Sequence, residues 1–554
     1  MLITLFFNII ICFVILGYSG LFKSIILNNK SISIDNLDFI YGIVFLALFS
    51  LLVNFFLPIS FFKVFVIIIG LIFFVFFFFR KKFSINFIFL FFFLAIFSFF
   101  TYWNGNNADS PIYHIQTINW IHDYKVTFGL AILDWHYALN SIWHLILSLL
   151  SISYKNFNTL YTINFIPFAF LFNEIFSKYK KNSLSNFTLF SCTSFLIIFS
   201  FIHPYKNGII FNHLGNPEVD TIGMIFFILS GIIFLRYLDS KNENEFKLLI
   251  VTSILCPLIK FNYIGAVLFP IFANFYLKRS IRTYFNLANF FSILLIFFWT
   301  IRNFIQSSCF LFPVKLTCYD TGWSLGSNQV QFYLNQTKSF SRDTPLRDKY
   351  LDFEYTIYSF DWFLPWFKNY FLEDAFLKIS FSVLFISLFI YLILILKNFY
   401  LKKNLKDIKI VVYILLLFLL NIYIWFQAPE IRFGWGILIF FPCTIFAIIV
   451  SKLEILKKLN GNILSFFFLC LIFLPVIKNY SYFKKENLLD PFVKNFNYSK
   501  IVKISNSNGF EIYQSKNWMC GDFKGICINK RKKDYTINLK NNYLFISTTD
   551  RETN

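Results

Sequence analysis

The chain has 554 residues, of which 57% are hydrophobic and 14% are charged. Soluble globular proteins carry about 45–50% apolar and about 25% charged residues, so this composition excludes an ordinary soluble protein, and also a disordered or collagen-like chain. The formal net charge is +21. In a membrane protein, basic residues serve mainly to fix orientation. We therefore predict an integral membrane protein with many spans and no nucleic-acid partner.

Apolar segments of about 20 residues, the length that crosses a bilayer, recur along most of the chain. Such segments lie at 2–22, 39–57, 62–79, 83–103, 158–177, 185–202, 221–238, 284–301, 376–396, 410–427, 434–450 and 461–477. The stretch 248–277 contains Pro257, Lys260 and Pro270, which favour a hairpin or a broken helix. We predict an all-α transmembrane domain over residues 1–477 with about 12–14 transmembrane helices. The first of them is expected to be retained, because no small-residue cleavage site follows it.

Basic residues lie in one set of the short connections between these segments. They occur within 80–82, 178–181, 236–241, 278–279, 402–406 and 457–458. The positive-inside rule makes these connections cytoplasmic. Alternation of the spans then places 104–157, 203–220, 302–375, 428–433 and the tail 478–554 outside. All six His and all four cysteines that lie outside the predicted spans share this side. We expect the functional face of the protein to be periplasmic or otherwise extracytoplasmic.

The outer segments have features of their own. The connection 302–375 is far longer than an ordinary loop, which predicts a functional role. Alternating runs at 535–539 and 543–546 predict strands, so the tail 478–554 is expected to form a small α/β or β unit. Cys520 and Cys527 are expected to form a disulfide rather than a metal site. The apolar segment 138–151 is expected to lie flat on the outer surface as an interfacial helix.

Acidic residues enter two of the outer loops at the membrane boundary. Asp109 stands just before Pro111, and Asp220 stands directly before a predicted span. A carboxylate at such a place can act as a general base. The alternative is that both residues serve only in helix capping and turns. Because both are expected at one depth on one face, together they favour an aqueous active cleft.

The segment after Asp109 is rich in aromatic and imidazole side chains. His114 and His122 are eight residues apart, as are His136 and His144. Residues eight apart on a helix lie about two turns apart, too far to bind one metal ion together. We predict no metal site from these residues, and the cofactor remains open, a divalent cation included.

Three basic residues are candidates for binding an anion. Lys260 lies within an apolar stretch, where ionisable residues usually have a function, although a hairpin tip would simply hydrate it. Arg302 ends a predicted span on the outer side, and Arg432 lies in a short outer turn. The forked guanidinium of arginine suits a phosphate group. For Arg432 the alternatives are an ion pair with Glu430 or a solvated anchor at the interface.

The order of these motifs resembles a family of bacterial multi-pass membrane proteins with a GT-C glycosyltransferase-like layout. The residues that carry the resemblance are Asp109, Tyr113-His114, Asn216-Pro217-Glu218-Val219-Asp220, Lys260, Arg302-Asn303, Pro313, Trp425, Ala428-Pro429, Arg432-Phe433 and Cys520/Cys527. The resemblance implies transfer of a sugar, with inversion, from a polyprenyl-phosphate donor to an outer-face glycan, lipid or protein. It would make Asp109 the base, Asp220 a supporting acid and Arg432 a phosphate contact.

Together these arguments define an expected site. The expected catalytic residues are Asp109, His114 and Asp220, and the expected substrate-binding residues are Tyr113, Trp120, Lys260, Arg302, Glu430 and Arg432. One alternative function is a transporter or flippase of a lipid-linked saccharide, which the broken segment 248–277 favours. Another is a non-catalytic assembly protein whose tail binds a partner. A charge-lined path across the membrane would favour transport, whereas a cleft closed on the cytoplasmic side would favour transfer.

Overall fold

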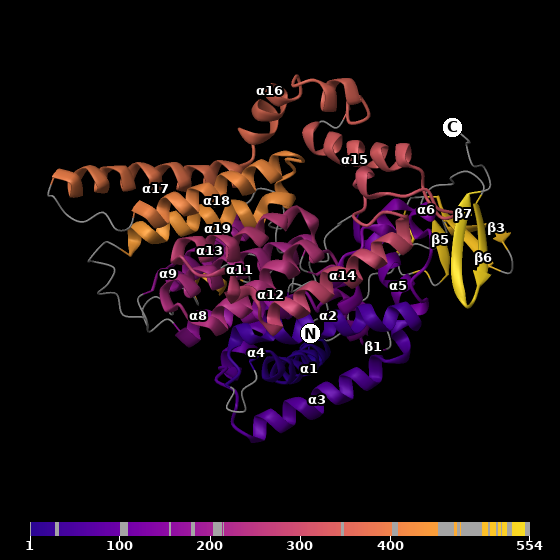
Figure 1. The fold of residues 1–554 in the computed structure, drawn as a ribbon, viewed down its shortest axis with the longest axis horizontal. Helices are drawn as coiled ribbons and strands as arrows, with labels where there is room; N and C mark the ends of the chain where they lie inside the picture. The colour runs from indigo at the N-terminus through magenta and orange to yellow at the C-terminus, as the bar shows by residue number, and fades with distance from the viewer. Residues whose placement is uncertain are drawn as a thin grey trace.

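The fold is mostly helical, with a small group of strands at one end (Figure 1). The computed structural model describes residues 2–27, 33–99, 109–154, 157–178, 183–202, 213, 215–344, 348–400, 408–451, 470–473, 477, 501–507, 510–516, 519–521, 523, 525–528 and 535–548. All structural statements below concern these residues.

Seven helices are long and apolar enough to cross a membrane. They are α1 (Leu2–Leu27), α2 (Phe39–Phe56), α11 (Asp220–Ser240), α14 (Leu287–Ser307), α17 (Ala375–Tyr400), α18 (Ile408–Phe426) and α19 (Ile431–Val450). Shorter apolar helices occupy other predicted spans: α3 (Lys63–Phe79), α4 (Phe87–Phe99), α8 (Phe165–Lys178) and α9 (Leu184–Ile202). Another short apolar helix, α13 (Leu268–Leu277), lies in the ambiguous stretch 248–277. Among the described residues, the structure therefore supports seven helices of spanning length, and the expected number of 12–14 stays a prediction. Most of the predicted span 461–477 lies outside the described residues.

Helix α11 lies at the centre of the helical domain. Its spanning window is entirely buried, whereas most other long helices keep an exposed apolar side. It packs against α9, α19 and α12 (Glu243–Ile259). A helix that is apolar on all sides belongs inside a bundle, because every face can be buried there. This position brings Asp220, at the start of α11, next to residues from several other helices.

The ambiguous stretch 248–277 forms a helical hairpin. Helix α12 ends at Ile259, a 3₁₀ segment (Phe261–Val267) follows, and α13 runs to Leu277. The two ends of the hairpin meet, because the Arg279 guanidinium donates a hydrogen bond to the Lys241 carbonyl (3.4 Å). Lys260 therefore lies at the tip, at the other end of the hairpin from that contact.

The structure corrects the expectation for segment 138–151. Its helix, α7 (Ile142–Leu150), is buried along its whole length and does not lie on the surface. It packs between α2, α12 and α5 (Ile115–Asp123). Ser141 and Asn140 find internal partners in the carbonyls of Ile259 and Trp299. The apolar pattern was recognised correctly, but neighbouring helices, rather than lipid headgroups, cover it.

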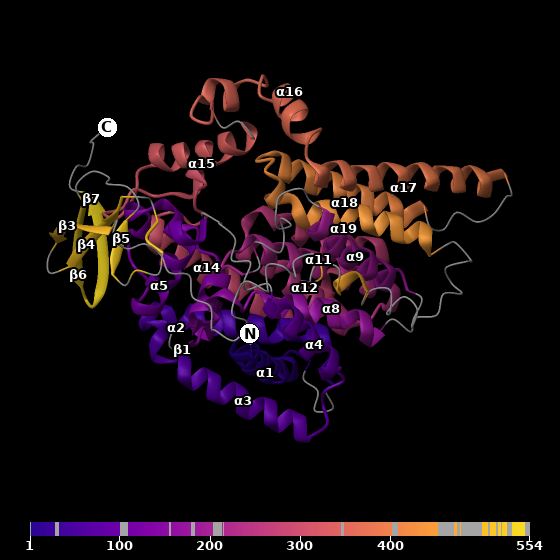
Figure 2. The same ribbon diagram turned by 180° about the vertical axis from the view of Figure 1, so that it is seen from behind.

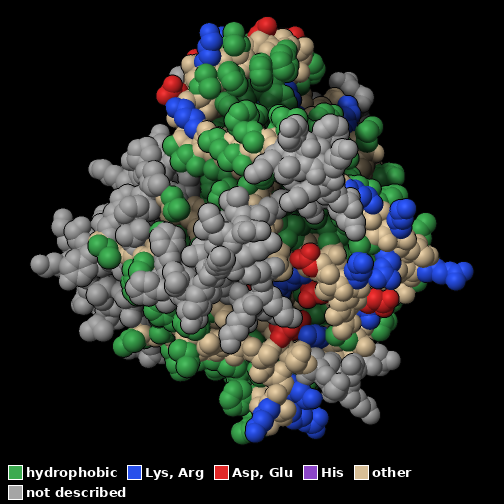
Figure 3. Space-filling view, turned by 90° about the vertical axis from the view of Figure 1, so that its left-hand side faces the viewer, with side chains coloured by type: hydrophobic (Ala, Val, Ile, Leu, Met, Phe, Trp, Pro, Cys, Tyr) green, Lys and Arg blue, Asp and Glu red, His purple; other side chains and the backbone are tan. Residues whose placement is uncertain are grey.

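The connections between helices fall at two opposite ends of the domain. The left-hand end in Figure 1 holds the end of α17, the start of α18 and the end of α19. Figure 3 looks onto this end, where Lys and Arg side chains lie together on one side beside several acidic ones. The opposite end holds α5, α6 (Leu130–Leu133), α15 (Ser327–Arg342) and the strands, as the view from behind also shows (Figure 2).

The compartment that each end faces can be tested by cysteine labelling. Cysteines placed at exposed positions 123 and 348 should react with a membrane-impermeant maleimide in intact cells, because their segments are expected to be translocated. Cysteines at exposed positions 241 and 279 should react only after permeabilisation. Cys470→Ser supplies the background, because the other free cysteines among the described residues are buried. Equal labelling of 123 and 241 would contradict the predicted orientation.

The tail forms a β unit, and two of its strands, β6 (Tyr535–Lys540) and β7 (Tyr543–Thr548), match the predicted runs. Strands β3 (Ile501–Ser507), β4 (Phe510–Ser515) and β5 (Ile526–Ile528) form one sheet, in which β3 and β4 are antiparallel and β4 and β5 are parallel. Strands β6 and β7 form an antiparallel hairpin. The predicted Cys520–Cys527 disulfide is present.

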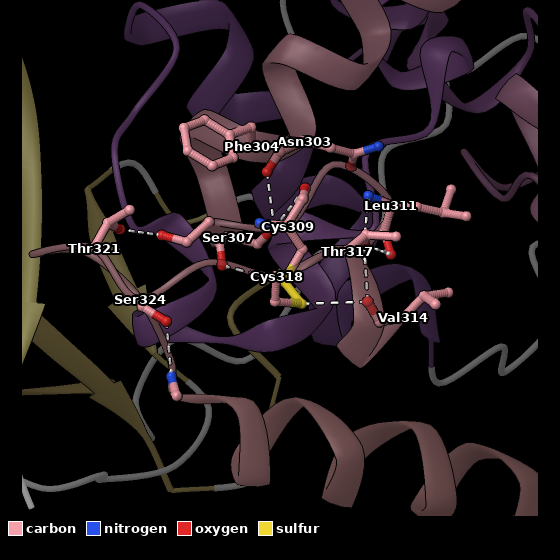
Figure 4. Close-up of a disulfide and its surroundings, with 12 residues drawn as sticks. Asn303, Phe304, Ser307, Cys309, Leu311, Val314, Thr317, Cys318, Thr321 and Ser324 are labelled. Atoms are coloured by element: carbon pink, nitrogen blue, oxygen red, sulfur yellow. Dashed lines mark hydrogen bonds between the residues drawn. A yellow bond between two sulfur atoms is a disulfide. The ribbon is translucent and has the colours of Figure 1, made fainter.

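A second disulfide closes the turn that follows α14. Cys309 and Cys318 are bonded, and Figure 4 shows the surrounding hydrogen bonds. The Ser307 hydroxyl accepts from the Cys309 amide (3.2 Å), and the Thr317 hydroxyl accepts from the Leu311 amide (3.0 Å). These contacts fix the start of the long connection 302–375 relative to the helical domain.

Candidate functional site

Four charged side chains from distant parts of the chain meet at the end of the domain that carries the strands. Asp109 precedes a π-helical turn (Ser110–His114), Asp220 begins α11, Lys260 lies at the hairpin tip, and Arg432 is in the first turn of α19. Arg432 is ion-paired with Asp109, and Lys260 with Asp220. A guanidinium nitrogen of Arg432 also lies 3.8 Å from a carboxylate oxygen of Asp220. We call these four residues the ionic cluster.

The ionic cluster lies at the edge of the packed interior. The side chains of Asp109 and Arg432 are 23% and 22% exposed, whereas that of Asp220 is only 4% exposed. The ring of Phe433 lies under Lys260, with the ammonium 4.3 Å from the ring centroid. An aromatic face attracts a cation and keeps it near the carboxylates. A solute from outside would therefore reach Asp109 and Arg432 before it reached Asp220.

The alternative of simple helix capping does not describe these carboxylates. Asp109 occupies the residue before the π-helical turn, but its side chain makes no capping hydrogen bond. Its carboxylate is paired with Arg432, and that of Asp220 with Lys260. Both carboxylates thus form ion pairs with basic side chains from distant parts of the chain.

The charge of Arg432 controls the acidity of Asp109. Burial by itself raises the pKa of the Asp109 carboxyl, but the charge of Arg432, the nearby His114 and the hydrogen bond from Arg432 outweigh it. The net result is a pKa below the usual range. While paired, Asp109 is ionised and is a weak base. An anion that drew Arg432 away would remove this effect and make the carboxylate a stronger base.

The turn that carries Arg432 is held from several sides. The Trp425 indole donates to the Glu430 carbonyl (2.8 Å), and the Tyr370 hydroxyl accepts from the Ile431 amide (3.1 Å). The Glu430 carboxylate accepts a hydrogen bond from Thr344 (3.1 Å). The expected alternative, an ion pair between Arg432 and Glu430, is thus replaced by pairs with the acidic residues of the cluster. Because Thr344 and Tyr370 belong to the long connection 302–375, that connection helps to position Arg432.

Behind Asp109 lies a pair of buried histidines. The His114 Nδ1 and His144 Nε2 atoms are 2.8 Å apart, and the two residues are 1% and 3% exposed. The ring of Tyr113 stacks on that of His136, with the centroids 4.8 Å apart. The Nδ1 atom of His136 is hydrogen-bonded to the Asp134 carboxylate (2.7 Å). Spacing along one helix could not reveal the His114–His144 pair, because it joins two helices. In the described part of the chain, no three His, Cys, Asp or Glu residues are placed to hold a metal ion together.

These buried histidines should make the protein sensitive to acid. Burial lowers the pKa of His144 to about 3 and that of His114 well below its usual value, so both are neutral when folded. An unfolded histidine titrates near 6.5, so stability should fall as the pH drops from about 6.5 towards 3, by about 1.4 kcal/mol per pH unit for each histidine. Melting temperatures in detergent between pH 7.5 and 4.5 measure this. The slope should be shallower in His144→Gln and unchanged in His122→Gln, whose side chain is partly exposed.

Two expected substrate-binding residues have structural partners elsewhere. Arg302 is 2% exposed and is hydrogen-bonded to Asn54, Asn140 and Gln306. Trp120 is buried in a small second core between α5, α6 and the tail strands. Neither residue belongs to the ionic cluster. Tyr113 and His114, in contrast, are next to Asp109 in the chain and pack behind it.

The tail supports the helix that follows Asp109. The Gly521 amide donates to the Pro111 carbonyl (2.8 Å), and the Gln116 side chain donates to the carbonyls of Gly521 and Phe523 (3.0 Å each). Gly521 and Phe523 lie inside the loop closed by the Cys520–Cys527 disulfide. The disulfide loop therefore orders the first turn after Asp109. Composition alone gave no reason to expect that the tail would contact this helix.

Three residues next to the ionic cluster were not among the expected site residues. Glu218 is 0% exposed and is paired with His213, whose ring contacts Trp435 (centroids 5.3 Å apart). The sequence could have indicated Glu218, because it is an acidic residue in the same short motif as Asp220. His213 and Trp435 had no comparable signal, because their proximity is created by the packing of α19 against α11.

Comparison with known proteins leads to one family. No curated protein and no solved structure matches the chain. A family model described as "Domain of unknown function (DUF8201)" matches residues 1–439, which include all four residues of the ionic cluster and most of the helical domain. The chain therefore belongs to the DUF8201 family.

Proposed function

We propose that this protein is a GT-C-like membrane glycosyltransferase. It transfers a sugar from a polyprenyl-phosphate donor to a glycan, lipid or protein acceptor on the outer face of the cell membrane. The observation that supports this most directly is the ionic cluster, where two cations and two carboxylates lie together at the edge of the buried interior. A phosphate needs the cations, and an acceptor hydroxyl needs a carboxylate.

The proposed reaction uses the pairing within the cluster. The donor phosphate competes with Asp109 for Arg432 and is also bound by Lys260. Asp109, once released, removes the proton from the acceptor hydroxyl. The acceptor oxygen forms a bond to the anomeric carbon from the opposite face, and the bond from that carbon to the phosphate oxygen breaks with its electron pair. Arg432 and Lys260 stabilise the negative charge on the departing polyprenyl phosphate.

The interior of the domain favours transfer over transport. Between Asp220 and Arg236, α11 contains no charged residue, and its window is wholly buried. Its middle is lined by apolar side chains such as Phe227 and Ile232, with one hydrogen bond between Ser230 and Ser253 (2.6 Å). A translocated phosphate would have to pass charged or polar groups along such a path. The central helix supplies only the hydroxyls of Thr221 and Ser230 between Asp220 and Arg236, and no charged group, so a flippase is the second candidate.

Glycan analysis of a deletion strain tests the proposal. The strain should lack one sugar substituent on an envelope glycan, lipid or protein, and plasmid-borne wild-type protein should restore it. The Arg432→Gln protein should insert normally but fail to restore it, because a neutral amide cannot replace the charged fork at the phosphate. An unchanged glycan profile in the deletion strain would contradict the proposal. Full restoration by Arg432→Gln would contradict the role of the ionic cluster.

A further inference from the structure

Next to the ionic cluster, three side chains form a second group: His213, Glu218 and Trp435. Glu218 lies two residues before Asp220, and Trp435 lies one helical turn after Arg432 on the same side of α19. The His213 ring is bonded to the Glu218 carboxylate through Nδ1 and meets the Trp435 ring edge-on at 77°. Glu218 thus lies in the segment that leads directly into α11, and Trp435 lies on α19, the helix that presents Arg432.

Two polar atoms of this group are buried without a hydrogen-bond partner among the described residues. They are the second carboxylate oxygen of Glu218 (Oε1) and the indole nitrogen of Trp435 (Nε1). The two residues are 0% and 1% exposed. Buried polar groups are nearly always hydrogen-bonded, so each such atom calls for an explanation. The carboxylate oxygen of Glu218 is able to accept a hydrogen bond, and the indole N–H of Trp435 is able to donate one.

The segment that carries Glu218 is rigidly held. The Asn164 amide donates to the carbonyls of Asn216 (2.7 Å) and Glu218 (2.9 Å). Asn164 is itself fixed by the Trp143 indole, which donates to its side-chain oxygen (2.7 Å). Loose packing therefore does not account for the unpartnered Glu218 oxygen. Rigidly held polar atoms that lack partners are typical of a preorganised binding site.

We infer that Glu218 and Trp435 bind hydroxyl groups of the donor sugar, which makes them specificity-determining residues. This inference rests on the proposed function. A sugar hydroxyl both donates and accepts a hydrogen bond, so it satisfies a carboxylate oxygen and an indole N–H. The group adjoins Lys260 and Arg432, which matches a donor whose sugar is attached directly to a phosphate. His213, with a side chain 19% exposed, is the most accessible of the three, so the sugar enters past its ring.

Binding of lipid probes to the full-length protein in nanodiscs tests this inference. The probes are undecaprenyl phosphate and its glucose, mannose and N-acetylglucosamine derivatives. Wild-type protein should bind at least one glycosylated lipid about tenfold or more tightly than the bare phosphate, the effect of one or two hydrogen bonds. Trp435→Phe and Glu218→Gln should each reduce this preference and leave binding of undecaprenyl phosphate unchanged, which also shows that the variants are folded.

Trp120→Phe is the matched control. Its indole nitrogen is also buried and without a hydrogen-bond partner among the described residues, but Trp120 lies in the second core between α5, α6 and the tail strands. This variant should keep the full preference. If wild-type protein binds undecaprenyl phosphate without any preference, or if Trp435→Phe keeps the preference, the inference is wrong and the phosphate site stands. If wild-type protein binds none of the four lipids, the proposed function itself fails.

Discussion

Replacing Asp109 by Asn is expected to reduce sugar transfer by roughly 10²–10⁴-fold, the usual contribution of a general base. The amide is close in size to the carboxylate, so packing around His114 and Pro111 should change little. Arg432 keeps a second carboxylate nearby, because Asp220 lies 3.8 Å from it. The loss should therefore appear in turnover and not in expression or membrane insertion. The measurement is recovery of the missing glycan in the deletion strain, together with transfer by purified protein.

The matched control for this prediction is Asp123→Asn. Asp123 lies in the same segment of the chain, at the end of α5, but its side chain is 48% exposed and paired only with the neighbouring His122 among the contacts described. Its replacement should leave transfer unchanged. Wild-type levels of product in Asp109→Asn would show that this carboxylate is not the base. A loss of product in both variants would point to a general effect of charge on the outer surface.

Replacing Arg236 by Met is expected to lower the free energy of unfolding by roughly 3–5 kcal/mol, since it leaves a buried carboxylate without its partner. Arg236 is ion-paired with Glu174, and the two side chains are 8% and 1% exposed. The pair joins α11 to α8 near the end of the domain that is expected to be cytoplasmic. Denaturant titration of the purified protein in detergent measures the change.

A double variant distinguishes two causes of instability: loss of the Glu174–Arg236 ion pair itself, and the buried negative charge that the Arg236 variant leaves behind. Glu174→Gln combined with Arg236→Met removes both buried charges and should recover most of the lost stability. Lys503→Met breaks an exposed pair with Glu511 in the tail and should have no measurable effect. If the double variant is as unstable as Arg236→Met alone, the uncompensated carboxylate is not the cause.

Several features were predictable because they depend on local sequence. The apolar helices follow from hydrophobicity over about 20 residues, and the tail hairpin from the alternation within 535–548. The Cys520–Cys527 disulfide follows from short spacing in a segment without nearby histidine. The order of spans and basic connections predicted that Asp109 and Asp220 share one depth and one face of the membrane, and this placement in the membrane stays a prediction. In the structure both carboxylates do lie in one cluster.

Other features depend on packing between distant segments, and only the tertiary structure decided them. Asp109 and Arg432 are 323 residues apart, so no local pattern could show that they would pair. The burial of α7 and the internal partners of Arg302 likewise depend on which helices become neighbours. The same holds for the His114–His144 pair and for the contact of the tail with Gln116. Hydrophobicity and periodicity determine which segments become helices or strands, because those properties act over a few turns of one chain segment. The partners of each buried polar group are set by long-range packing, because a polar group in the interior must be paired with whatever the neighbouring helices present.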